Sequence, residues 1–107
     1  MAFSLNIHAV HPHPGQGETA RQLRSLHPSE ISISHRFCNK VLNAYTIRCV
    51  PQVHGITHDT IKFVQKIIST DINSAIDNPL VFAKMQEIVS ASNFHGEYPA
   101  KSVDFHP

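Results

Sequence analysis

Tyr45 and Arg48 are the two side chains in this sequence best placed to act on one ligand. Residues three apart on a helical turn share a face, so a phenol and a guanidinium would lie side by side here. A guanidinium is always charged, and its planar fork of N–H donors matches the two oxygens of a carboxylate. The pair therefore predicts a carboxylate-binding position. Spacing alone is more typical of an ordinary surface tyrosine and arginine beside a helix start.

Three blocks of sequence carry a much more specific pattern. They are Tyr45-x-x-Arg48-Cys49-x-Pro51-Gln52-Val53-x-Gly55, Ile72-Asn73-Ser74-Ala75 followed by Asp77-Asn78-Pro79-Leu80-Val81-Phe82, and Asn93-Phe94-His95-Gly96-Glu97-Tyr98-Pro99-Ala100-Lys101. In order and rough spacing they resemble the aromatic amino-acid ammonia-lyase family, its histidase branch most closely. Ile7-His8-Ala9, Pro12-His13 and Gly15-Gln16 resemble the family's preceding segment. The likeness covers nearly the whole chain.

The resemblance implies a lyase that eliminates ammonia from L-histidine to give urocanate, a step of histidine catabolism. Family members use an electrophilic prosthetic group, methylidene-imidazolone (MIO), formed from an internal Ala-Ser-Gly. By the resemblance, Arg48 would bind the substrate carboxylate and Tyr45 would be catalytic, with its hydroxyl near the prosthetic group. Phe94 would line the substrate pocket. His95, directly after it, is typical of the histidase branch, where the phenylalanine branch usually has Gln.

The sequence departs from the family pattern at several functional positions. Leu42 stands three residues before Tyr45, where the family has a substrate-holding Gln, and a leucine cannot hydrogen-bond. Ala91 and Ser92 replace a Gly-Gly pair, so the placement of Phe94 is in doubt. No Ala-Ser-Gly occurs in the chain, because Ala91-Ser92 is followed by Asn93. We therefore expect no prosthetic group in this chain, no metal, and no activity by the chain alone.

Length places a further limit on function. The chain has 107 residues, whereas the family's chains are several times longer and mostly helical. We expect residues 1–107 to form one incomplete segment, a slice of a long-helix bundle subunit, without the family's base-bearing loop. In the family the active sites are shared between subunits of a homotetramer, so one slice would not assemble a complete site.

Composition and charge exclude several classes of partner. The formal net charge is +1, and positive and negative residues are scattered along the chain. The sequence therefore has no basic cluster of the kind that binds nucleic acid or an anionic membrane. No apolar run is long enough to span a bilayer, and residues 1–11 lack the features of a secretory signal. We therefore expect a cytoplasmic protein in which Cys38 and Cys49 are reduced.

The predicted fold is mainly α-helical with irregular loops and a possible small β-hairpin. Residues 1–14 contain two prolines and no periodicity, which predicts irregular backbone. Short helices and a loop are expected over 15–50, with the clearest short helix at 15–26. Within that range, 29–34 alternates like a strand, although Ser29 could equally cap a helix. The remainder, 76–107, predicts a hairpin, a loop and the start of another helix.

The long helix predicted over 51–75 is the strongest element in the sequence. Its apolar residues recur at helical spacing and form one stripe, made of Val53, Ile56, Ile61, Val64, Ile67, Ile68 and Ile72. Asp77-Asn78-Pro79 is expected to end it. A hairpin of Leu80–Phe82 and Glu87–Val89 should follow.

Two alternative functions remain open from sequence. Nine histidines in 107 residues suggest a metal-binding module, and His54 and His58 lie one helical turn apart. However, Gly55 stands where a His-Glu-x-x-His protease has its glutamate, and no third ligand has convincing spacing. The other alternative is an interaction fragment that docks on full-length subunits through the apolar stripe.

Overall fold

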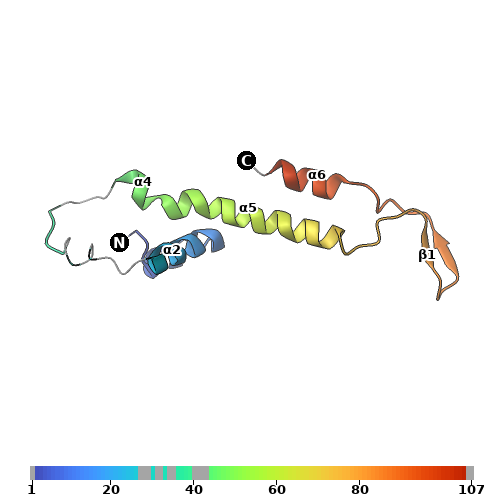
Figure 1. The fold of residues 1–107 in the computed structure, drawn as a ribbon, viewed down its shortest axis with the longest axis horizontal. Helices are drawn as coiled ribbons and strands as arrows, with labels where there is room; N and C mark the ends of the chain where they lie inside the picture. Colours follow the sequence, from blue (N-terminus) through green and yellow to red (C-terminus); the bar gives the residue numbers. More distant parts are fainter. Residues whose placement is uncertain (1, 27–29, 31–32, 34–35, 40–43, 106–107) are drawn as a thin grey trace. The chain divides into compact units, whose positions relative to one another are not determined.

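The computed structural model describes residues 2–26, 30, 33, 36–39 and 44–105 (Figure 1). Over these residues the chain has five α-helices and one two-stranded antiparallel sheet, which confirms the predicted mainly helical class with a small hairpin. The chain divides into two compact units, residues 1–59 and residues 60–107, and the boundary falls inside the long helix. Each unit is described by itself.

The first unit begins with α1 (Leu5–Ala9), a short helix where the sequence predicted irregular backbone over 1–14. That prediction rested on prolines, but the first of them is Pro12, beyond the end of α1. Helix α2 (Pro14–Leu26) confirms the helix predicted over 15–26. Proline is well tolerated as the first helical residue, because the N–H that it lacks would have no partner within the helix.

A hydrogen-bond network joins α1 to α2 through the buried side chain of Gln16. Its Nε2–H donates to His8 Nδ1 at 2.9 Å, and its Oε1 accepts from His11 Nδ1–H at 2.9 Å. His8 Nε2–H in turn donates to the Ala2 carbonyl at 3.1 Å. Because a carbonyl can only accept, this last bond fixes the His8 tautomer, and the tautomer fixes the orientation of the Gln16 amide.

The strand-like pattern over 29–34 and the position of Leu42 fall largely outside the described residues. The description resumes before α4 (Tyr45–Arg48), which continues through Cys49 into α5 (Val50–Asp71). The Cys49 N–H donates to the Tyr45 carbonyl at 3.0 Å, and the Cys49 carbonyl accepts from the Val53 N–H at 3.0 Å. These two backbone hydrogen bonds link α4 to α5 across Cys49, whereas Pro51 has no N–H to donate to the Ile47 carbonyl.

Helix α5 confirms the predicted long helix, but it ends at Asp71 rather than near Ala75. The two residues responsible bond back to the last turn: Asn73 Nδ2–H donates to the Ser69 carbonyl at 2.7 Å, and Ser74 Oγ–H donates to the Thr70 carbonyl at 2.6 Å. These carbonyls have no partner within the helix at its C-terminus, so the side chains complete the helix and end it.

The face of α5 that is buried in the first unit is not the apolar stripe. Pro51 and Gly55 are buried, whereas Val53 and Ile56 are 62% and 66% exposed. Among the described residues, Ala20 of α2 is the one buried hydrophobic side chain besides Pro51. The first unit therefore packs through small residues and leaves its two stripe residues, Val53 and Ile56, in solvent.

In the second unit, β1 (Leu80–Phe82) and β2 (Glu87–Val89) pair antiparallel with Leu80 opposite Val89, as predicted. Gln86 closes the turn with a positive φ of 54°. Asn78 holds the base of the hairpin, because its Oδ1 accepts from Ser90 Oγ–H at 3.1 Å and from Ala91 N–H at 2.8 Å.

Helix α6 (Glu97–Asp104) is the further helix whose start was expected within 76–107. Phe105, just after α6, contacts Phe63 of α5 edge to face, with ring centroids 6.2 Å apart. A groove of about 580 Å³ lies here, with apolar lining from Phe63, Ile67, Tyr98 and Phe105 and ionisable lining from Lys66, Asp71, Glu97 and Lys101. The second unit thus has an open groove rather than a closed core.

The base of the hairpin gives a first testable prediction. Asn78→Ala removes both hydrogen bonds at the base of the strands, each worth about 1 kcal/mol. We expect faster amide hydrogen exchange at Ala91 and across the hairpin, measured by NMR. Asn73→Ala, which affects only the end of α5, serves as the control. Unchanged exchange at Ala91 in Asn78→Ala would contradict the role assigned to this side chain.

The exposed apolar stripe gives a second prediction. Large exposed apolar surfaces favour association, so we expect the purified chain to self-associate with increasing concentration in sedimentation velocity. Ile61→Glu should reduce that association, because Ile61 lies on the stripe and is 46% exposed. Lys62→Glu introduces the same side chain at the next residue, which is exposed on the polar side of the helix. Equal association of the two variants would rule out the stripe as its cause.

Candidate functional site

Tyr45 and Arg48 lie together as their spacing predicts. The Arg48 guanidinium carbon is 5.2 Å from the centroid of the Tyr45 ring, a cation–π contact. Helix α4 contains only these two residues and the two between them, so one helical turn brings the pair together. The contact restricts the Arg48 side chain and orients its fork, while Tyr45 itself is 70% exposed.

The base of the Arg48 side chain is buried. Its Nε atom is inaccessible to solvent and has no hydrogen-bond partner in the structure as described. A buried donor without a partner costs free energy, and such a group is often completed by a ligand or water. The guanidinium is therefore a charged fork with an unused donor, which is the chemistry that a carboxylate complements.

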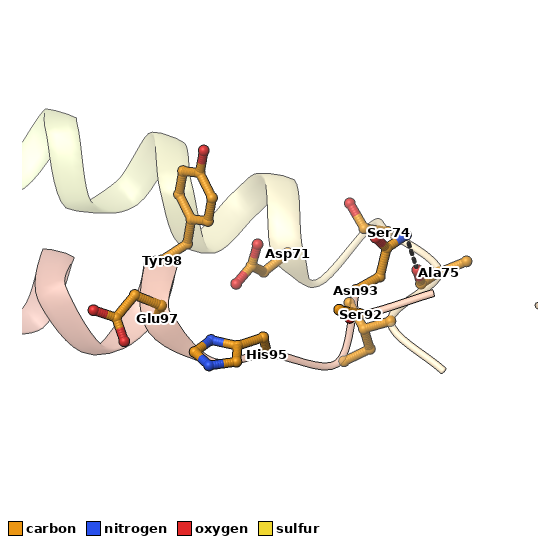
Figure 2. A pocket seen from close by; sticks show the side chains of 9 residues that line it. Asp71, Ser74, Ala75, Ser92, Asn93, His95, Glu97 and Tyr98 are labelled. Atoms are coloured by element: carbon orange, nitrogen blue, oxygen red, sulfur yellow. Dashed lines mark hydrogen bonds between the residues drawn. The ribbon is translucent and has the colours of Figure 1, made fainter. Parts of the chain in front are cut away.

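Phe94, the predicted pocket residue, is 60% exposed and belongs to the second unit. Its neighbours Asn93 and His95 line a hollow of about 410 Å³ together with residues of α5 and α6. Figure 2 shows Asp71 on the α5 side of this hollow and His95 and Glu97 on the other side. Asn93 Nδ2–H donates to the Ala75 carbonyl at 3.4 Å, a long contact that spans the hollow's edge (Figure 2).

Phe94 and the Tyr45–Arg48 pair fall in different units, and each is described separately. The structure thus brings together two of the three predicted site residues. It also reveals contacts that the sequence reasoning missed, namely the Gln16 amide network and a close approach of Gly15 to Gly55. The close approach of the two glycines could have been suspected from the sequence. Glycine destabilises a helix interior, so a glycine within each helical segment indicates a packing reason for it.

Ala91, Ser92 and Asn93 lie between β2 and α6 and do not match the source of the family's prosthetic group. The Ala91 N–H is used in the bond to Asn78, and the third residue carries an amide side chain bonded to a carbonyl. No other Ala-Ser pair occurs in the sequence. The residues present do not fit an Ala-Ser-Gly triad.

The metal-binding alternative gains no support. His54 and His58 lie one turn apart on α5, as predicted, but in the parts of the chain that the structure describes no three His, Cys, Asp or Glu residues are arranged to hold a metal ion. The described helices also include none that is both long and apolar enough to cross a membrane.

Comparison with known proteins agrees with the resemblance. The family model for aromatic amino acid lyase matches residues 1–106. Curated histidine ammonia-lyases from Bos taurus and Homo sapiens are 61% and 60% identical over 109 residues, covering 97% of this chain. The protein of the same name from Myxococcus xanthus is 47% identical and covers 95%.

The match covers only part of each relative. The chain spans 17% of the bovine and human proteins and 20% of the bacterial one. The solved structure of a phenylalanine aminomutase from Pantoea agglomerans superposes with a TM-score of 0.75 and 30% identity, over 96% of this chain and 23% of that one. Fold and sequence agree over essentially the whole length of this chain, which therefore belongs to the aromatic amino acid lyase family.

Proposed function

We propose that this chain carries the carboxylate-binding part of a histidine ammonia-lyase site and does not catalyse the elimination by itself. The observation that carries the proposal is Arg48, whose fork is stacked on Tyr45 and whose Nε is buried without a partner. An amino-acid substrate presents a carboxylate, and a guanidinium binds it with two parallel charge-assisted hydrogen bonds.

The two residues have distinct roles in this proposal. Arg48 binds and orients the substrate carboxylate, and its stacking on the ring limits the rotamer freedom lost on binding. The exposed Tyr45 hydroxyl projects from the same turn, where it is available to donate or accept a proton near the bound substrate. Phe94 lines the side-chain part of the pocket in the complete site.

The proposed substrate is L-histidine and the product of the complete enzyme is urocanate. The support is the name shared by the relatives at about 60% identity. His95, next to Phe94, is consistent with that branch of the family. Because the chain spans a sixth of those relatives, completion by further segments or subunits, as in a cytoplasmic homotetramer, is part of the proposal.

The prosthetic group MIO supplies the family's electrophile, and no residue of this chain fits its precursor. We therefore assign no step of the reaction to that group here. What remains is binding and orientation of the substrate carboxylate. Binding alone lowers the free energy of substrate and transition state alike, so it does not accelerate the reaction.

Binding of L-histidine is the direct test of the proposal. Arg48→Ala should weaken it about 10- to 100-fold, because charge-assisted hydrogen bonds contribute about 1.5–3 kcal/mol. Arg48→Lys should recover only part of the loss, since lysine cannot form the bidentate pair. The measurement is a titration monitored by NMR of the labelled chain.

Two controls make this test specific. Histamine lacks the carboxylate and should bind equally weakly to the unmodified chain and to Arg48→Ala. Arg36→Ala removes the same charge at an exposed position and should leave L-histidine binding unchanged. Equal L-histidine affinity in Arg48→Ala and the unmodified chain would refute the proposed role of Arg48.

Turnover gives a separate prediction. The purified chain should produce no urocanate from L-histidine in an ultraviolet absorbance assay, because the sequence contains no Ala-Ser-Gly. A full-length relative, such as the bovine histidine ammonia-lyase, serves as the positive control. Urocanate formation above the blank by the chain alone would overturn the prediction.

A further inference from the structure

Helices α2 and α5 touch backbone to backbone in the first unit. A Cβ atom placed on Gly55 would lie 2.6 Å from the Gln16 backbone nitrogen and 2.7 Å from its Cα. A Cβ on Gly15 would lie 2.0 Å from the Gly55 carbonyl oxygen. The obstructing atoms are backbone, so no side-chain rotation can relieve the clash, and both positions require glycine.

The backbone of Gln16 at this crossing is itself held in place. Its side chain is 3% exposed and uses both polar atoms, one with His8 and one with His11. Two titratable groups lie beside this network: the His13 ring packs edge-on against the His11 ring, with centroids 4.5 Å apart, and Asp59 of α5 lies against Gly15. These hydrogen bonds therefore hold the Gln16 backbone at the position where it contacts α5.

The crossing connects to Arg48 through a short, rigid path. Arg48, at the end of α4, precedes Pro51 and Gly55 of α5 by three and seven residues, a spacing that places residues on one face where the backbone is helical. Pro51, between them, is among the most completely buried side chains described. The two backbone bonds of Cys49 join α4 to α5, so we expect a shift of α5 at Gly55 to move the Arg48 fork.

We propose that Gly55, in contact with Gln16, is a positioning residue for substrate, setting where the Arg48 fork meets the substrate carboxylate. This inference rests on the carboxylate-binding role proposed for Arg48. A displacement of about 1 Å in a binding group is enough to lose a large part of its effect, so a single methyl group at Gly55 should reach the site.

The test compares Gly55→Ala with Gly17→Ala in the full chain. A Cβ on Gly17 meets nothing within 4 Å, so that variant adds the same methyl group to a neighbouring helical glycine without a clash. Selective arginine labelling allows NMR to follow the Arg48 Nε–H resonance and its hydrogen exchange in dilute samples without ligand. L-histidine is then titrated, and helix content is checked by circular dichroism.

We expect Gly55→Ala to shift the Arg48 Nε–H resonance, accelerate its exchange, and weaken L-histidine binding about tenfold or more. Gly17→Ala should change none of these. An unshifted Arg48 Nε–H with unchanged exchange in Gly55→Ala would overturn the positioning role. If the unmodified chain does not bind L-histidine, the carboxylate-binding proposal fails, while the Nε–H measurement still decides whether Gly55 controls the position of Arg48.

A second route covers the case in which Gly55→Ala loses its helical structure. In the unmodified chain, a nuclear Overhauser contact between the Gly55 α-protons and the Gln16 N–H is expected, and its absence would refute the crossing. Gln16→Ala keeps the backbone contact atoms but removes both amide bonds that hold them in place, so it should also shift the Arg48 Nε–H resonance. An Arg48 signal unaffected by Gln16→Ala would then count against the proposal.

Discussion

The first unit depends on a close approach of two backbones, Gly15 and Gln16 of α2 against Gly55 of α5. A glycine inside a helix costs about 1 kcal/mol relative to alanine, so two glycines at one contact need a compensating gain. The gain here is packing: the helices approach without side chains between them, and Pro51 becomes fully buried beside the contact. Over the residues that the structure describes, this unit is held by contact between small residues and by one amide network rather than by a large apolar core.

Local patterns predicted most elements of the fold. The 3.6-residue period predicted α5, and two short apolar runs after Asp77-Asn78-Pro79 predicted the β1–β2 hairpin, because both signals lie within the element that they specify. The packing of α5 was not predictable in this way. Its apolar stripe suggested one buried face, yet Pro51 and Gly55 lie on another, and small residues carry no hydrophobic signal. Helix α1 was missed because irregular backbone was predicted for all of 1–14 from its prolines, although the first of them, Pro12, lies beyond the end of α1.

In the candidate site, too, contacts within one helical turn were predictable from sequence, and contacts that depend on tertiary packing were not. The contact of Tyr45 with Arg48 was predictable, because it depends on a spacing of three within one turn. The burial of the Arg48 Nε was not, since it depends on how α4 continues into a packed helix. Similarly, nothing near His8 and His11 in sequence indicates that the Gln16 side chain bonds to both of them.

It is physically reasonable that carboxylate binding by Arg48 is separate from the elimination of the amino group. The carboxylate of an α-amino acid carries the same charge before and during loss of the amino group, so a guanidinium bound to it stabilises both states to a similar extent. Such an interaction orients the substrate and raises affinity, and its value to catalysis depends on where it holds the reacting carbon. Position is therefore the property of Arg48 that matters most. Under the positioning role proposed for Gly55, about two helical turns from Arg48, a residue that touches no ligand would be as restricted in type as one that does.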